Sequence, residues 1–82
     1  MTLPNIHLGG TPRSMLHGDY QRAEHAVWEA MQAFEHIEFN GRDYPAEKWD
    51  AAVEERTKAL KALQSAYLYL NAHSEHTAPS IV

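Results

Sequence analysis

Residues 11–38 read TPRSMLHGDYQRAEHAVWEAMQAFEHIE, and the spacing of the apolar side chains in this stretch decides the fold class. These side chains recur at alternating steps of four and three residues, at Leu16, Tyr20, Ala23, Val27, Ala30, Phe34 and Ile37. Such spacing places them on one face of an α-helix. Thr11 can cap this helix with its hydroxyl, and Pro12 suits the first helical position. We therefore expect an amphipathic helix over about residues 12–38.

A second stretch of the chain repeats the pattern. Its apolar stripe also steps by four and three residues, at Trp49, Val53, Arg56, Leu60, Leu63, Tyr67 and Leu70. Pro45 suits a first helical position, and Glu47 falls in the first turn, where the helix dipole favours a negative charge. We expect a second helix over about residues 45–72.

A short turn at residues 39–44 joins the two predicted helices. Asn40 and Gly41 tolerate positive φ, so the first helix can stop and the chain can reverse there. Two long helices with a short connection make an antiparallel hairpin, here over residues 11–72. The expected fold class is therefore all-α.

The two outer segments show no helical periodicity. Residues 1–10 contain Pro4 and a Gly9-Gly10 pair and are predicted to be an extended N-terminal segment. Residues 73–82 contain Pro79 and are predicted to be a flexible tail.

Composition excludes several classes of function. The chain has 82 residues, which is enough for one domain. It has no cysteine, which excludes disulfides, thiolate metal sites and a cysteine nucleophile. No apolar run approaches the roughly 18 residues of a membrane span, and the N-terminus lacks the features of a signal peptide. The net charge of −4 has the wrong sign for a protein dedicated to long nucleic acids. We expect a cytoplasmic protein with no membrane partner.

The predicted hairpin has more apolar surface than one helix–helix seam uses. Trp28, Met31 and Phe39 lie off the first stripe. Small side chains recur at seven-residue spacing beside the stripes, at Ala26, Ala33, Ala52, Ala59 and Ala66. Because domains of this size are marginal even with a closed core, we expect a homo-oligomer, most simply two hairpins in a four-helix bundle. The alternative is that the N-terminal segment and the tail cover these residues.

Catalytic, metal and cofactor chemistry have little support in the sequence. No nucleophile elbow, phosphate-binding lysine loop or dinucleotide-binding glycine motif occurs. His73 and His76 have chelating spacing but lack the pattern of a zinc protease, so a solvated helix end is the simpler interpretation. We expect no catalytic residue, no metal and no cofactor. A catalytic site that uses His25 or His36 is the weakest alternative.

The first candidate binding element is the start of the first helix. Gly9 and Gly10 let backbone N–H groups approach a ligand, and the positive end of the helix dipole suits an anion. Side-chain donors follow at Thr11, Arg13 and Ser14. The alternative is an ordinary start of a helix.

The second candidate element is the central turn, which consists of Asn40, Gly41, Arg42, Asp43 and Tyr44. Arg42 can pair with a phosphate, and Tyr44 can stack on a base or ring. The alternative is that Arg42 bridges to Asp43 while Tyr44 packs on the end of the hairpin. In one hairpin the two elements stand about 40 Å apart. Antiparallel pairing of two hairpins would bring one element of each kind together.

Arg56 is the third candidate, because a charge in an apolar seam is costly unless it is paired. Counting outward from the turn pairs Arg56 with Ala30 and Tyr20 with Tyr67, and a slip of one turn is the alternative. This register makes Glu29 the nearest carboxylate. Arg56 is then a structural bridge, a ligand contact, or a side chain that extends past the small alanine to solvent.

The stretch from Asn5 to about His73 resembles small uncharacterised proteins of phage and prophage genomes. The resemblance lies in Gly10-Thr11, in two amphipathic helices and in the turn Asn40-Gly41-Arg42-Asp43-Tyr44. Pro45 departs from that pattern, which has a second aromatic residue there. The resemblance implies a phage accessory protein. In size and architecture only, the chain is also similar to phage sponge proteins, which sequester immune signalling nucleotides without cleaving them.

These observations predict a non-enzymatic homo-oligomer that binds a small anionic, nucleotide-like ligand between subunits. The alternative is an adaptor protein that docks on another protein through an apolar surface that includes Trp28, Met31 and Tyr69.

Overall fold

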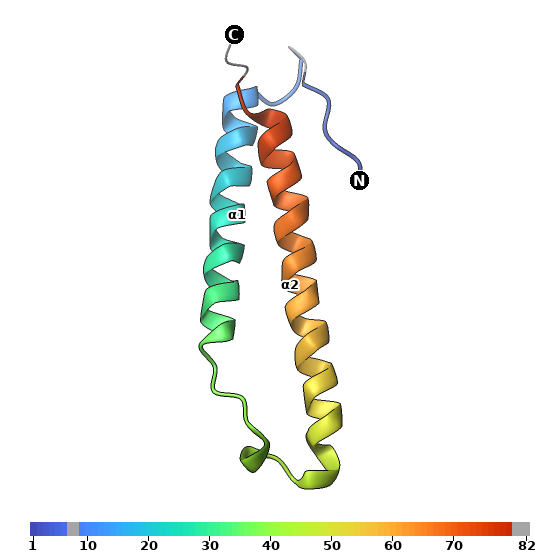
Figure 1. Ribbon diagram of the computed structural model, residues 1–82. Coiled ribbons are helices and arrows are strands. Elements are labelled where there is room, and N and C mark those ends of the chain that lie inside the picture. Colours follow the sequence, from blue (N-terminus) through green and yellow to red (C-terminus); the bar gives the residue numbers. More distant parts are fainter. Residues whose placement is uncertain (7–8, 80–82) are drawn as a thin grey trace.

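The computed structural model describes residues 1–6 and 9–79, and it shows two long antiparallel helices side by side (Figure 1). Helix α1 spans Arg13–Glu35, and helix α2 spans Trp49–Thr77. No strand occurs among the described residues. The predicted all-α hairpin is therefore confirmed.

The helices meet along the two predicted stripes, but the seam is shallow. Tyr20 and Val27 of α1 and Leu60 and Leu63 of α2 are half-buried, and no apolar side chain in the described ranges is fully buried. The molecule measures 59 × 22 × 20 Å, with a radius of gyration of 18.0 Å. A compact domain of this length has a radius of gyration of about 12 Å. One hairpin therefore has no closed hydrophobic core.

Neither proline takes the first helical position that the sequence predicted. Pro12 precedes α1 with extended ψ (140°), and its carbonyl accepts hydrogen bonds from the N–H groups of Met15 and Leu16 at 3.1 Å. No side chain caps α1, so the expected role of Thr11 is wrong. Pro45 likewise precedes a short 3-10 helix rather than α2 itself.

The connection is longer than the predicted turn. α1 ends at Glu35, three residues early, and the chain passes through two 3-10 helices, η1 (Gly41–Asp43) and η2 (Ala46–Lys48), before α2 begins (Figure 1). No residue in the described ranges has positive φ, so Gly41 does not reverse the chain in the expected way. Gly41 instead lies over the Trp49 ring, where an added Cβ would stand 3.7 Å from the ring atoms.

The longer connection shifts the predicted register by one to two turns. The Tyr20 ring lies 4.9 Å from the ring of His73 and not opposite Tyr67. The guanidinium of Arg56 lies over the ring of Phe34, 5.3 Å from its centroid, instead of over Ala30. Each residue of α2 therefore faces a residue of α1 closer to the loop than we expected.

The predicted flexible tail is wrong for residues 73–77, which form the last turns of α2. The most buried side chains of the described chain lie there: His73 is 1% exposed, Ser74 6% and Thr77 0%. The His17 ring of α1 approaches the Ser74 carbonyl with its Nδ1 at 2.9 Å. Residues 80–82 of the predicted tail lie outside the described residues.

The N-terminal segment also holds this end of α2. Nδ1 of His73 lies 2.8 Å from the carbonyl oxygen of Tyr69, and Nε2 lies 3.2 Å from that of Thr2. His76 Nε2 donates to the Pro4 carbonyl at 2.8 Å. His73 can be buried because backbone carbonyls lie within hydrogen-bonding distance of its ring, whereas His76 remains exposed.

Candidate functional site

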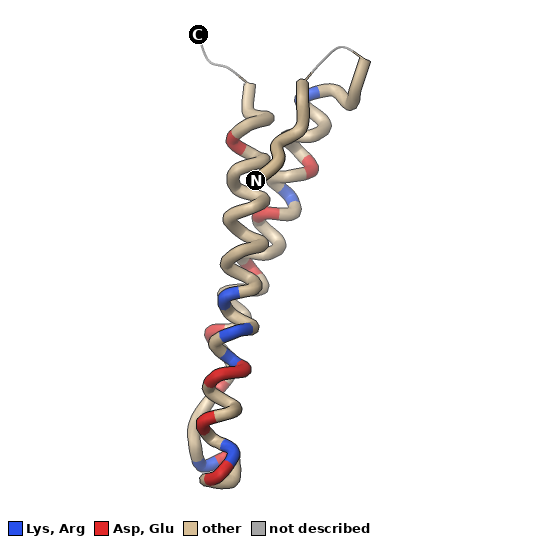
Figure 2. Tube along the Cα trace, turned by 90° about the vertical axis from the view of Figure 1, so that its right-hand side faces the viewer, with Lys and Arg blue, Asp and Glu red and all other residues tan. Residues whose placement is uncertain are grey.

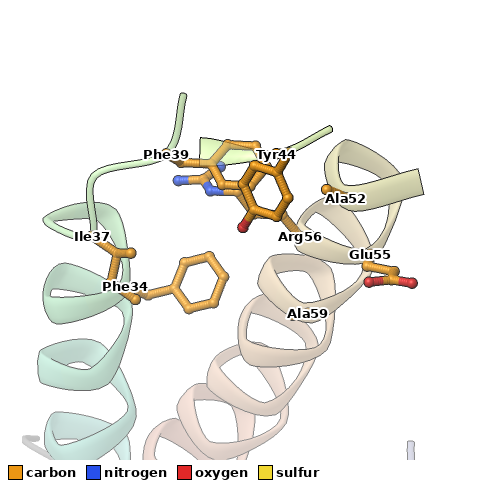
Figure 3. Close-up of a pocket in the computed structure, with 8 residues that line it drawn as sticks. All are labelled: Phe34, Ile37, Phe39, Tyr44, Ala52, Glu55, Arg56 and Ala59. Carbon is orange, nitrogen blue, oxygen red and sulfur yellow. The ribbon is translucent and has the colours of Figure 1, made fainter. Parts of the chain in front are cut away.

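The hollow at the loop end of the hairpin is the best candidate site, and we refer to it as the loop-end hollow (Figure 3). It has a volume of about 310 Å³. Residues of α1, the connection and α2 form its walls: Phe34, Ile37, Phe39, Tyr44, Ala52, Glu55, Arg56 and Ala59. The walls are mostly apolar, with one guanidinium and one carboxylate.

Three aromatic rings shape this end of the molecule. Phe39 lies against Trp49 with ring centroids 4.9 Å apart, and Tyr44 completes the cluster at 5.6 Å from Phe39 and 5.7 Å from Trp49. The connection follows a longer path than a tight turn because it wraps around these rings. Tyr44 therefore packs on the end of the hairpin, as the alternative interpretation of the turn expected.

The guanidinium of Arg56 lies in the wall of the loop-end hollow, next to two aromatic rings. It lies 5.3 Å from the centroid of Phe34 and 5.0 Å from that of Phe39. The described residues include no carboxylate in ion-pair distance of Arg56, and Glu29, its expected neighbour, pairs with His25 at 2.9 Å. Because guanidinium groups are attracted to ring faces, the two phenylalanines take the place of a carboxylate partner.

The other residues of the predicted central site lie beside the hollow and do not line it. Gly41, Arg42 and Asp43 form η1 and are exposed, and the described chain shows no ion pair between Arg42 and Asp43. The Asn40 side-chain oxygen is buried and has no hydrogen-bond partner among the described residues. A buried acceptor without a donor is unfavourable by about 1–3 kcal/mol, so this atom is ready to accept a hydrogen bond.

The first predicted binding element stands at the other end of the hairpin. Thr11, Arg13 and Ser14 are exposed at the start of α1, far from the connection (Figure 1). Within one chain the structure therefore does not bring the two predicted groups of ligand residues together. Only Tyr44 and Arg56 of the predicted ligand residues line the loop-end hollow.

A second, more polar hollow of about 240 Å³ lies between the helices. Gln21, Glu24, His25 and Trp28 line it from α1, and Tyr67 lines it from α2. His25 stacks on Trp28 with centroids 6.1 Å apart, and His25 is exposed. The Nε2 atom of His25 pairs with the exposed carboxylate of Glu29 at 2.9 Å, and Glu29 is not among the residues that line this hollow.

Metal-ligand side chains do not converge in the described part of the chain, which contains no group of three that could hold an ion. His73 and His76, which have chelating spacing in the sequence, face backbone carbonyls instead. None of the helices of the described residues is long and apolar enough to cross a membrane.

The sequence missed most of the wall of the loop-end hollow. The sequence pattern predicts that Phe34, Ala52 and Ala59 pack between helices, and it indicates for Phe39 only excess apolar surface. The spacing of residues 52, 55, 56 and 59 does put them on one side of a helix, but only the path of the connection shows that this side stays open.

Comparisons of the chain with protein-family models, with curated proteins and with solved structures found no match.

Proposed function

We propose that this chain is a non-enzymatic binding protein, which takes a small anionic, nucleotide-like ligand at the loop end of the hairpin and acts as a homo-oligomer. The loop-end hollow carries this proposal. Its volume of about 310 Å³ lies at the lower end of the range for small-ligand sites, which are also mostly apolar with a few polar groups.

The chemistry of the walls supports a ligand with a flat ring and a negative group. Phe34 and Tyr44 offer faces or edges on which a ring can stack, and Arg56 supplies a positive charge in the wall. Arg42 is exposed two residues before Tyr44 and has no partner among the described residues, so it is available for a phosphate.

Self-association supports the placement of the ligand between subunits. One hairpin leaves the hollow open and buries no apolar side chain fully in the described ranges. A second copy would cover apolar surface and bring Thr11, Arg13 and Ser14 of one chain toward the loop end of another. If the chain is a phage accessory protein, as the resemblance implies, a host antiviral signalling nucleotide is a candidate ligand for sequestration.

A second candidate function is that of an adaptor that docks on another protein through its apolar surface. The specific observation in its favour is the exposure of large apolar side chains away from the hollow: Trp28 is 46% exposed, Leu68 62% and Tyr69 46%. Large exposed apolar side chains are a feature of interaction sites when they lie together in one patch.

A capture-and-release assay tests the proposed function. The protein is incubated with cyclic dinucleotides and cyclic ADP-ribose isomers, separated from free ligand, heat-denatured, and the released compound is identified by mass spectrometry. Intact recovery supports sequestration, whereas a converted product identifies an enzyme. No capture from the panel would contradict the proposal and favour the adaptor.

Matched arginine variants test the site. Arg42→Ala should weaken capture by about tenfold to a hundredfold, which corresponds to one or two charge-assisted hydrogen bonds. Arg22→Ala is the control, because Arg22 is exposed on α1, where it pairs with Asp19. Unchanged capture by Arg42→Ala would show that the ligand does not bind at the loop.

A further inference from the structure

Alanines of both helices lie on one side of the hairpin, and we call this side the alanine face. It comprises Ala26, Ala30 and Ala33 of α1 and Ala52, Ala59 and Ala66 of α2, all of them exposed except the half-buried Ala52. The loop-end hollow shows that the two rows share a side, because Ile37 and Ala59 both line it. Ala33, Ala30 and Ala26 precede Ile37 by 4, 7 and 11 residues, and Ala66 follows Ala59 by seven, so each row continues along one side of its helix.

The opposite side of the hairpin is more polar. The second hollow opens there, and Trp28 and Tyr67 share its walls with Gln21, Glu24 and His25. On α2, Thr57 and Gln64 are exposed on the corresponding side. The alanine face therefore presents smaller side chains than the opposite side, where the Trp28 side chain is 46% exposed.

The hairpin exposes more surface than a compact monomer of its mass, and the excess is large enough for a dimer interface. The accessible surface of the chain is 6359 Å², whereas a compact monomer of 9.3 kDa exposes about 5,000 Å². The excess exceeds the roughly 800 Å² per partner that a standard interface buries. Since small side chains let helices approach to about 8 Å, the alanine face is the side on which a second hairpin can pack most closely.

We infer that a second copy of this chain covers the alanine face, with its loop at the opposite end. A twofold axis fits the alanine face because its two rows of alanines are centred at nearly the same height along the hairpin. Ala30 is the middle of its row and Ala59 of the other. Counting from the contact between His17 and Ser74, these alanines lie 13 and 15 residues along their helices, a difference of about 3 Å in height. A twofold axis across the face at that height pairs each row with itself.

Charge favours this orientation over one with both loops at the same end. Residues 30–59 hold seven acidic and four basic side chains, a net charge of −3, whereas the remainder holds four acidic and three basic, a net charge of −1. Figure 2 shows that charged residues are dense along the lower half of α2 and sparse along its upper half. Opposite orientation separates the two more acidic halves, which repel each other when adjacent.

This arrangement has a consequence for the loop-end hollow, and that consequence rests on the proposed function. A copy on the alanine face closes the open side of the hollow. It also brings the start of its own α1, with Arg13 and Ser14, toward Arg42 and Tyr44, because 17 residues of helix separate Ala30 from Arg13, about 26 Å. The two predicted groups of ligand residues then meet at each end of the dimer.

Cysteine cross-linking tests the face and the orientation, since the chain has no cysteine of its own. Ala59→Cys places a thiol near the inferred axis, so the two copies should form a disulfide under mild oxidation and run as a dimer on a non-reducing gel. Thr57→Cys is the matched control, because Thr57 is also exposed but lies about 200° around the same helix. The Thr57→Cys protein should run as a monomer on the non-reducing gel.

A mixture of Ala52→Cys and Ala66→Cys proteins tests orientation, because these positions face each other across the inferred axis. The mixture should cross-link, and neither protein should cross-link alone. Circular dichroism verifies that each variant is folded, and light scattering gives its mass.

Two outcomes contradict the inference, and a third separates it from a failure of ligand capture. A folded monomer at all concentrations would overturn self-association altogether. A dimer that cross-links through Thr57→Cys and not Ala59→Cys would overturn the alanine face while leaving self-association intact. A dimer that cross-links through Ala59→Cys but captures no nucleotide would uphold this interface and contradict only the proposed ligand.

Discussion

Replacement of Arg56 by methionine tests whether two aromatic rings stabilise the charge in the seam. Methionine keeps an unbranched apolar stem but removes the guanidinium. At partly exposed sites, one cation–π contact contributes about 0.5–1 kcal/mol. Arg56 lies 5.3 Å from Phe34 and 5.0 Å from Phe39, so two contacts contribute about 1–2 kcal/mol. Because Arg56 is only half-buried, desolvation of its charge offsets little of this.

We therefore expect Arg56→Met to lower the free energy of unfolding by about 1–2 kcal/mol. Urea titration followed by circular dichroism at 222 nm measures this change, at a low and a high protein concentration because self-association adds to stability. Arg42→Met is the matched control. Its side chain is exposed and is not among the cation–π pairs of the described residues, so its effect should stay within about 0.5 kcal/mol.

A double-mutant cycle with Phe39→Leu isolates the interaction between charge and ring. We expect a coupling energy of about 0.5–1 kcal/mol between Arg56 and Phe39. Zero coupling, or an Arg56→Met protein as stable as the original, would refute the reasoning. It would mean that Arg56 contributes only its apolar stem and that the seam accepts any long side chain.

Three further substitutions address the other end of the hairpin. Gly18→Ala should raise the free energy of unfolding by about 0.5–1 kcal/mol, because Gly18 is helical and an added Cβ would meet only the flexible Arg22 side chain; a lower thermal midpoint would contradict this. Thr77→Val should lower the free energy of unfolding by about 1 kcal/mol, since the hydroxyl that donates to the carbonyl of His73 at 2.9 Å is lost; unchanged urea unfolding would disagree. His73→Ala should release the N-terminal segment, because the contact with the Thr2 carbonyl is removed. Limited proteolysis with mass spectrometry should then show faster cleavage near the N-terminus than in the original protein, and equal cleavage rates would count against a role for His73 in holding the segment.

The helices could be predicted because their signal is local. Alternating steps of four and three residues place the stripe from Leu16 to Phe34 on one side of α1 whatever that side packs against. The same reasoning holds for α2 from Trp49 to Leu70. Two such stripes joined by a short connection can pack against each other in one chain as an antiparallel hairpin, as the structure shows.

The candidate site could be predicted only in part. Arg56 stood out because a charge interrupted an apolar stripe, and Tyr44 because it lay beside Arg42 in the connection. The sequence did not show that Phe34 and Phe39 would replace a carboxylate as partners of Arg56. That pairing depends on the path of the connection, and no local pattern encodes this path.

Residues 73–77 show that the burial of a side chain cannot always be predicted from its neighbours along the sequence. His73, Ser74 and Thr77 are polar and follow the last apolar residue of the stripe, so they predicted a solvated tail. They are instead the most buried residues of the described chain, because carbonyl groups of α2 and of the N-terminal segment lie against the His73 ring and accept from the Thr77 hydroxyl. A polar side chain can be buried when its hydrogen-bond partners come from elsewhere in the chain, and those partners are not visible in its neighbours along the sequence.

Periodicity and length are enough to predict two amphipathic helices, their antiparallel pairing and a surplus of small apolar side chains. The ends of the helices, the residues that face each other and the open hollow depend on contacts between distant parts of the chain. The rings of Phe39, Tyr44 and Trp49 pack together, and the connection that carries them is longer than a tight turn. The register is therefore shifted by one to two turns, which changes the neighbours of Arg56 and His73.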